Sequence, residues 1–310
     1  MIMMADMSTA MEPMNCVVQR TADGLEVWNG EQFQTVDQAT LAAMFGLPPE
    51  KVTIHMLYAG GSFGRRACTQ SDYLREAASI VKASGTRAPV KLVWMREDDM
   101  KAGYYRPLFH HRIEAALDAD GSIRAWRHRL VGQSIIAGSA FEPAMVKNGI
   151  DAVSVEGAAN RPYAIPNLQV ELHTPTDIKV PVLWWRSVGS THTAYSTETF
   201  LDRLAAEAGL DWGQYNYANL LATGRGVAED QAHALRCYRQ AAEQGHAKSM
   251  NLLGRYLEEG QHCPADSAAA FEWYRRSAEG GDFRGQFSYA SVLADDGRVE
   301  EALLWLHRAL

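Results

Sequence analysis

The chain has 310 residues, of which 30 are basic and 37 acidic, so its formal net charge is −7. With 47% hydrophobic and 22% charged residues, the composition is that of a globular protein and excludes a disordered or collagen-like chain. At about 150 residues per domain, the length predicts two domains. The acidity argues against nucleic acid or an anionic membrane as the main partner, because phosphate binding requires a clustered cationic surface.

The cysteines and the start of the chain indicate an intracellular, reducing environment. No C-x-x-C pair joins the four scattered cysteines, so neither a zinc site nor a disulfide framework is signalled; they are Cys16, Cys68, Cys237 and Cys263. No segment approaches the roughly 18 apolar residues of a membrane-spanning helix. Residues 1–10 lack an export signal and are expected to be irregular, which predicts a cytoplasmic protein.

The first hundred residues alternate strands with helices. Strands are predicted at 17–19, 25–28, 52–57 and 90–94, and helices at 37–45 and 71–83. Gly46 and Gly85 follow the two helices as stop signals.

The next hundred residues continue this mixture of strands and helices. Strands at 111–117 and 122–132 flank the turn Asp118-Ala119-Asp120-Gly121 and predict a hairpin. Further strands are expected at 168–173 and 180–183, followed by a helix at 193–208 with Gly209 behind it. These elements predict an α+β domain of mixed or antiparallel strands with helices, over residues 11–209, and a domain boundary near 209–213.

The last hundred residues repeat at a fixed period. Tyr217-Ala-Asn-Leu-Leu, Leu253-Gly-Arg-Tyr-Leu and Tyr289-Ala-Ser-Val-Leu are spaced 36 residues apart. Each copy reads as two helices, and the inter-helix loop of the third copy is about four residues shorter. In the first copy, a helix at 230–244 places its small and aromatic residues on one face. Such hairpins are stable only when stacked, which predicts an all-α solenoid of three repeats over 212–310.

The repeats resemble the Sel-one-like repeats, relatives of the tetratricopeptide repeats, in Gly224-Arg-Gly-Val227 and in Ala241-Ala-Glu-Gln-Gly245. That resemblance implies a solenoid that binds another protein, as yet unknown. The alternative is a structural stack without a site of its own. We expect Trp273 to fill the gap between hairpins, with Trp273→Ala costing about 3–5 kcal/mol. His246, His262 and His307 are expected on turns or solvated faces.

Two segments of the first domain have the residue types of a binding site. The loop Gly60-Gly-Ser-Phe-Gly-Arg-Arg66 lies between a predicted strand and a predicted helix, so its backbone N–H groups would suit an anion. It matches neither a Walker A loop nor the dinucleotide fingerprint, and a plain tight connection is the alternative. The segment Trp184-Trp-Arg-Ser-Val-Gly189 places Arg186 behind two aromatics, where stacking for structural packing is the alternative role.

Taken together, five motifs resemble the large subunits of molybdenum hydroxylases. They occur in the family's order: 11–15, the stretch around Gln32, the loop 60–66, Val93-Trp-Met-Arg-Glu-Asp-Asp99, and 185–189. The resemblance covers residues 11–209 and is greatest to the isoquinoline 1-oxidoreductase beta subunit, within the xanthine dehydrogenase and aldehyde oxidase family. It implies a molybdopterin cofactor, in bacteria usually the cytosine dinucleotide, iron–sulfur clusters on a separate small subunit, and a cytoplasmic or periplasmic location.

The resemblance also assigns roles to individual residues. Gln32 matches the glutamine that hydrogen-bonds a molybdenum oxygen, from outside the direct ligands of the metal. Arg186 matches an arginine that orients substrate and stabilises negative charge. The loop residues match the segment that lies against the metal and pterin; they are Gly61, Ser62, Phe63, Gly64 and Arg65. Arg65, Arg66 and Ala67 differ from the residues that the xanthine branch has at these positions. This difference favours N-heteroaromatic or aldehyde substrates over xanthine-like ones.

One family feature is replaced in this sequence. The glutamate that serves as general base lies downstream of the matched region in the family, where this chain carries the repeats. A general base contributes about 10²–10⁴ in rate, so turnover by this chain alone is not expected. Two hypotheses follow: an oxidoreductase large-subunit fragment fused to an interaction solenoid, or a non-enzymatic repeat adaptor that carries a vestigial molybdopterin-domain fragment.

Overall fold

The computed structural model describes residues 2–3 and 10–310, and these form two compact units. One unit comprises 2–114 and 126–194, and the other 115–125 and 195–310. The predicted irregular start differs at β1 (Ile2–Met3), which pairs antiparallel with β6 (Phe109–Leu117). The rest of that prediction, apart from Ala10, falls outside the described residues.

The first sheet has the strand order β4-β3-β2-β5. Its strands are β2 (Asn15–Arg20), β3 (Leu25–Asn29), β4 (Val52–Met56) and β5 (Val90–Val93). β2 pairs antiparallel with β3 and β5, and β3 pairs parallel with β4. Burial alternates along β2 and β3 as expected for strands with one face in a core.

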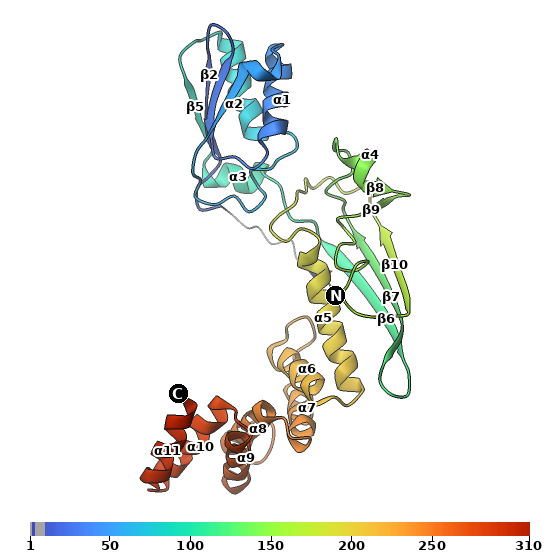
Figure 1. Ribbon diagram of the computed structural model, residues 1–310, viewed down its shortest axis with the longest axis vertical. Helices are drawn as coiled ribbons and strands as arrows, with labels where there is room; N and C mark the ends of the chain where they lie inside the picture. Colours follow the sequence, from blue (N-terminus) through green and yellow to red (C-terminus); the bar gives the residue numbers. More distant parts are fainter. Residues whose placement is uncertain (1, 4–9) are drawn as a thin grey trace. The chain divides into compact units, whose positions relative to one another are not determined.

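Two helices complete that core, α1 (Gln34–Phe45) and α2 (Asp72–Ser84) (Figure 1). Leu41 of α1 and Leu74 of α2 are fully buried in one cluster with Val18 and Val27 of the sheet. Gly46 and Gly85 end the helices in the left-handed conformation, as the sequence predicted. A short 3-10 turn, η1 (Pro49–Lys51), leads into β4.

The second sheet has the order β1-β6-β7-β10, with β7 at Ile123–Gly132 and β10 at Asn167–His173. Asp118 and Gly121 close the predicted turn between β6 and β7. The strand expected at 180–183 is reduced to a single bridge between Tyr105 and Val182, because Pro181 has no N–H with which to extend the ladder. Short elements not foreseen are α3 (Arg96–Ala102), α4 (Glu142–Met145), β8 (Val146–Lys147) and β9 (Ile150–Asp151).

The repeats form three helical hairpins after α5 (Ser190–Glu207). They are α6 (Asp211–Thr223) with α7 (Gln231–Glu243), α8 (Ala247–Glu259) with α9 (Ser267–Glu279), and α10 (Phe283–Asp295) with α11 (Val299–Ala309). The loop of the third hairpin spans 296–298, against 224–230 and 260–266 in the others, which confirms the predicted shortening. No helix in the described ranges combines the length and apolar character needed to cross a membrane.

The end of α5 carries a fourth copy of the repeat signature. Ala205-Ala-Glu-Ala-Gly209 precedes Ala241-Ala-Glu-Gln-Gly245 by 36 residues, and Ser277-Ala-Glu-Gly-Gly281 follows by another 36. The terminal glycine of each copy has a positive φ, of 83°, 103° and 81°. A Cβ on Gly213 of α6 would lie 2.3 Å from Cβ of Ala205, so the two helices pack at close range. The last turns of α5 therefore cover the first hairpin as the second helix of a repeat would.

His246 confirms the expectation of a turn position, but it is buried there and not solvated. It lies on the turn before α8, and only 5% of it is exposed. Its Nδ1 accepts from the backbone N–H of Ser249 and caps the helix. Burial lowers the pKa of this imidazole.

Candidate functional site

The loop from Gly60 to Arg66 has a backbone that only glycine adopts without strain at two of its positions. Gly61 and Gly64 have φ values of 100° and 97°, and Phe63 between them is also left-handed at 50°. A Cβ on Gly64 would lie 2.7 Å from the carbonyl oxygen of Trp184. The loop therefore lies directly against the 184–186 segment, more than a hundred residues away in sequence.

The structure brings Gln32 and Arg186 to this loop. The Oε1 atom of Gln32 accepts the backbone N–H of Gly64 at 3.0 Å, and the backbone N–H of Arg186 donates to the carbonyl of Phe63 at 2.9 Å. Both side chains are exposed. Since Oε1 of Gln32 is occupied, its side-chain NH₂ is the group left to donate to a ligand.

Three successive backbone donors of the loop face no acceptor in the described ranges. The N–H groups of Gly61, Ser62 and Phe63 make no hydrogen bond within 2–3 and 10–310, while those of Gly60, Gly64 and Arg65 are satisfied. Consecutive N–H groups in a chain that alternates into the left-handed region form a concave anion site. These donors fit phosphate or metal-bound oxygen, the polar groups of a molybdopterin cofactor.

Arg65 is placed differently from the other candidates. Its side chain is 1% exposed, and it donates to Asp99 at 3.0 Å and to Asp72 at 2.7 Å. The guanidinium also lies 5.5 Å from the rings of Trp94 and Tyr104. Its backbone N–H donates to Ser62, so Arg65 holds the loop from behind and offers no side-chain group to a ligand.

Glu12 supports the start of the loop. Its carboxylate accepts from the backbone N–H of Gly60 at 2.5 Å and from the side chain of Asn15 at 2.6 Å. The hydrogen bond from Asn15, followed by that from Gly60, lowers the pKa of Glu12. Glu12 therefore stays ionised and fixes the loop to the segment before β2.

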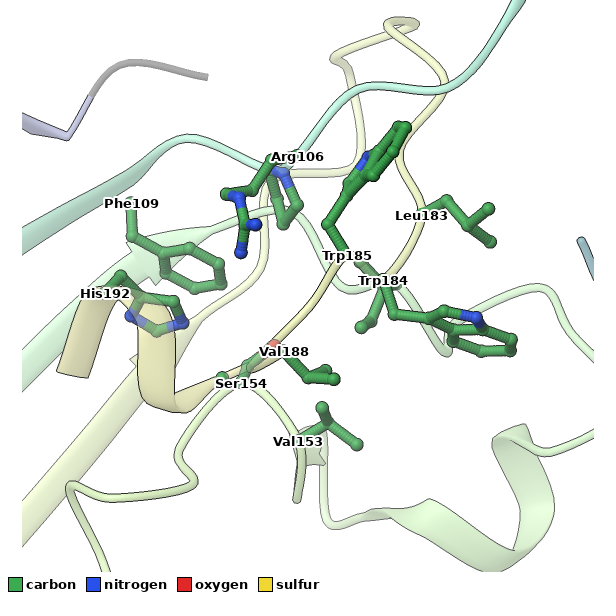
Figure 2. A pocket seen from close by; sticks show the side chains of 12 residues that line it. Arg106, Phe109, Val153, Ser154, Leu183, Trp184, Trp185, Val188 and His192 are labelled. Carbon is green, nitrogen blue, oxygen red and sulfur yellow. The ribbon is translucent and has the colours of Figure 1, made fainter. Parts of the chain in front are cut away.

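A small cavity adjoins the 184–186 segment. It holds about 20 Å³, the room of a single water molecule, between aromatic and aliphatic walls. Figure 2 shows Phe109 and His192 on one side of it and Leu183 on another. Arg106 also lines the cavity and donates to the carbonyl of Arg186 at 3.2–3.3 Å, so it fixes the backbone of that residue.

His192 ends a chain of three buried imidazoles that sequence reasoning missed. Nδ1 of His192 lies 3.2 Å from Nε2 of His111, and Nδ1 of His111 lies 2.8 Å from Nε2 of His128. Arg161 approaches Nδ1 of His128 at 3.5 Å. Because a guanidinium only donates, Nδ1 of His128 is assigned as an acceptor, and each ring then carries its proton on Nε2. The last of these protons, on His192, belongs to the ring that lines the cavity.

All three imidazoles are held neutral. Burial lowers the pKa of His111 to about 4 and those of His128 and His192 to about 3, with the positive charges of neighbouring groups adding to the effect. The histidines come from β6, β7 and α5, and no local spacing relates them. The only sequence signal for His111 and His128 was the alternation of polar and apolar residues within the two hairpin strands. Across the parts of the chain that the structure covers, no cluster of three or more His, Cys, Asp or Glu side chains is arranged to hold a metal ion.

Asp37 is a second buried titratable group beside the site. It is 1% exposed in the first turn of α1, five residues after Gln32. Burial, and then the charge of Glu31, raises the pKa of Asp37 to about 8. Burial therefore favours the neutral form of this carboxyl group.

Comparison with known proteins gives two matches along the chain. The model of the molybdopterin cofactor-binding domain matches residues 2–220, and that of the Sel1 repeat matches 213–246 and 247–282. The third hairpin lies beyond the matched repeats. The two matches overlap at 213–220, whereas the compact units divide at Tyr195 within α5.

Two individual relatives are subunits of oxidoreductases. The chain is 33% identical to the isoquinoline 1-oxidoreductase subunit beta of Brevundimonas diminuta, over 70% of this chain and 27% of the relative. It is 24% identical to the aldehyde oxidoreductase molybdenum-binding subunit PaoC of Escherichia coli K12, over 89% of this chain and 32% of the relative. The fold matches quinoline 2-oxidoreductase from Pseudomonas putida 86 with a TM-score of 0.55 and 22% identity, over 66% of this chain and 26% of that one.

The chain thus spans about a quarter to a third of the length of these relatives. The family match nevertheless covers more than two thirds of this chain and includes every element that builds the loop site. The protein belongs to the molybdopterin cofactor-binding domain family and carries Sel1 repeats behind that domain.

Proposed function

We propose that this chain supplies part of the cofactor-binding wall of a molybdenum hydroxylase that oxidises N-heteroaromatic or aldehyde substrates. The observation that carries the proposal is the loop at 61–64, where three backbone N–H groups, the side chain of Gln32 and the Arg186 segment meet. The substrate class and the partner, a small subunit with iron–sulfur clusters, rest on the relatives and on the resemblance of the motifs.

Each residue has a separate task in this proposal. The N–H groups of Gly61, Ser62 and Phe63 bind anionic oxygens, and the NH₂ of Gln32 donates to a further oxygen of the cofactor. Arg186 orients the substrate and stabilises negative charge that develops on it. Arg65 acts as a positioning residue through the loop. When bound, molybdopterin, proposed here in the cytosine dinucleotide form, supplies the metal centre that takes up the substrate's electrons.

Metal content tests the proposal directly. The chain is produced together with the cofactor-biosynthesis enzymes and its small subunit, and molybdenum per chain is measured with the visible spectrum. We expect a several-fold loss of molybdenum in Gln32→Ala and little change in Gln34→Ala, an exposed glutamine two residues away.

Substitutions at two glycines distinguish the effect of backbone strain from the effect of a close contact. Gly64 and Gly138 both have positive φ, but only at Gly64 would a Cβ meet a neighbour within 4 Å. Gly64→Ala is expected to lose molybdenum, while Gly138→Ala retains it. Wild-type protein without molybdenum under these conditions contradicts the proposal and favours the alternative, a repeat adaptor with a vestigial cofactor domain.

A further inference from the structure

A groove runs along the first helices of the second and third hairpins. A hollow of about 570 Å³ lies over α8, α10 and α11, and one of about 220 Å³ lies beside it over α6, α8 and α10. Both are lined by Asn251, Arg255, Phe283 and Arg284. The larger hollow has the size of ligand pockets in general, which span roughly 300–1,000 Å³.

The groove combines exposed aromatic rings with cations. Phe283 and Phe287 are 57% and 59% exposed, although most large apolar side chains of the hairpins are buried or partly buried. Lys248, Arg255 and Arg284 are exposed, and no carboxylate in the described part of the chain forms an ion pair with them. Lys248 and Arg284 lie over the rings of Trp212 and Phe283 instead.

This concentration of positive charge runs against the local composition. Residues 210–310 contain 10 basic and 14 acidic side chains, a net charge of −4. Arg275 and Arg298 elsewhere on the hairpins are paired with glutamates, whereas Lys248, Arg255 and Arg284 come together in the smaller hollow. Asp282 also lines this hollow, but it is only 7% exposed and its carboxylate accepts the backbone N–H of Gly285. The three exposed cations therefore dominate the accessible charge of the hollow and are complementary to a short acidic ligand. A long polyanion such as RNA would meet repulsion from the rest of the surface.

The spacing of the cations defines that ligand further. Lys248 and Arg255 are seven residues apart on α8, so they project from one face about 10 Å apart. An extended peptide covers this distance in about three residues. Arg284 occupies on α10 the position of Lys248 one repeat earlier, since 36 residues separate them.

We propose that this groove binds an extended acidic peptide segment of a partner protein, with carboxylates about three residues apart and an adjacent aliphatic or aromatic side chain on Phe283 and Phe287. The carboxylates pair with Lys248, Arg255 and Arg284. This inference goes beyond the proposed cofactor-binding role and rests on the interaction role that the resemblance to Sel-one-like repeats implies for the hairpins.

Fluorescence anisotropy with the full chain tests the proposal. The probe is a short labelled peptide with two glutamates three positions apart followed by leucine and phenylalanine, and its counterpart has glutamine at both glutamate positions. We expect the glutamate peptide to bind at least about tenfold more tightly, with affinity falling as salt rises. Equal affinity of the two peptides, or no binding of either, overturns the proposal.

Matched variants locate the binding. Arg255→Glu and Phe287→Ser are expected to weaken binding about tenfold or more. Arg239→Glu, on the exposed side of α7, and Leu303→Ser, an exposed leucine of α11 outside the groove, are expected to leave it unchanged. If the groove variants and the control variants change peptide affinity equally, the assignment of the groove is contradicted. It is also contradicted if a single-stranded oligonucleotide displaces the labelled peptide as well as the unlabelled peptide does.

A crosslinking arm separates this inference from the interaction role on which it rests. Photoreactive groups are placed in turn at Arg255 in the groove and at Arg239 on α7. One outcome is that the peptides do not bind and that a partner protein is crosslinked only at Arg239. This outcome rules out the groove as the binding site but is consistent with an interaction role of the repeats.

Discussion

At the residue scale, Arg65 shows how burial changes the role of a charged side chain. In the sequence, Arg65 and Arg66 end the glycine-rich loop, and the family resemblance places Arg65 in the segment that lies against the metal and pterin. In the structure both are 1% exposed, and Arg65 forms ion pairs with Asp72 and Asp99. A buried ion pair contributes little relative to an apolar replacement, but removal of one partner is costly because it leaves the other charge uncompensated.

Arg65→Ala is therefore expected to lower the free energy of unfolding by about 3–5 kcal/mol, because two carboxylates lose their counter-charge inside the fold. Urea unfolding followed by tryptophan fluorescence measures the loss. Arg203→Ala, which removes an exposed ion pair with Glu207, serves as control and should cost less than about 1 kcal/mol. A similar small cost at Arg65 would mean that the two carboxylates find other partners.

At the element scale, the three imidazoles link β6, β7 and α5. His192 lies in the first turn of α5, two residues after the helix begins, so the chain of hydrogen bonds ties the start of that helix to the sheet. The Arg186 loop ends where α5 begins. The imidazoles thus set the position of the segment that carries Arg186.

The imidazole chain predicts a pH dependence of stability. The pKa values of the three histidines in the folded protein, about 3 to 4, lie below the ordinary value near 6.5. Between these limits the unfolded chain binds protons that the folded protein does not. The contribution of the neutral imidazoles to the free energy of unfolding is therefore complete above pH 6.5 and is lost as pH falls toward 4.

A variant isolates this contribution. Each imidazole adds about 1.4 kcal/mol per pH unit to the slope of the unfolding free energy within that window. His128→Gln is expected to reduce the slope between pH 6 and pH 5 by about this amount, whereas His307→Gln, at an exposed position on α11, should leave it unchanged. An identical slope in His128→Gln would show that His128 is not held neutral.

The repeats supply a second prediction at this scale, which compares Trp273 with its neighbour Tyr274. Trp273 packs against the apolar cluster of the hairpins, as expected. Trp273 is only partly buried and Arg276 lies 4.3 Å from its ring, whereas Tyr274 beside it is 3% exposed. Tyr274 packs against Gly254, where a Cβ would come within 2.7 Å of the ring, and its hydroxyl donates to Glu258. Tyr274→Ala is expected to cost about 3–5 kcal/mol and Trp273→Ala clearly less, as measured by thermal unfolding. The reverse order would place the main contact at Trp273.

At the scale of the whole molecule, the apolar side chains form separate cores. One cluster contains buried residues from 218 to 302, a second contains residues from 10 to 81, and a smaller third lies around Phe109 and Leu130. Among the residues that the structure describes, these clusters share no buried residue. Substitutions in different clusters have no common partner and should act independently.

The double variant Arg65→Ala with Tyr274→Ala tests this independence. The change in unfolding free energy is expected to equal the sum of the single changes within about 0.5 kcal/mol. The measurement is a double-mutant cycle by urea unfolding of the full chain. A larger coupling energy would indicate that the cofactor domain and the hairpins stabilise one another.

The sequence predicted elements best where the pattern is local. The helix expected at 230–244 is α7 (Gln231–Glu243), with Asp230 as its cap, because apolar periodicity, a capping side chain and a terminal glycine lie within one segment. The motif around Gly61 and Gly64 was found in the same way. Its partners Gln32 and Arg186 came from the resemblance to a family, since nothing in the spacing of these residues relates them.

By itself, the sequence determined the two kinds of architecture, the 36-residue period and the glycine loop, all of which depend on short-range preferences of the backbone. The tertiary structure decided that Arg65 is buried, that His111, His128 and His192 form one chain, and that the end of α5 acts as a repeat helix. It also gathered Lys248, Arg255 and Arg284 along one groove. These features depend on contacts between residues far apart in sequence, and side-chain periodicity within one element does not encode such contacts.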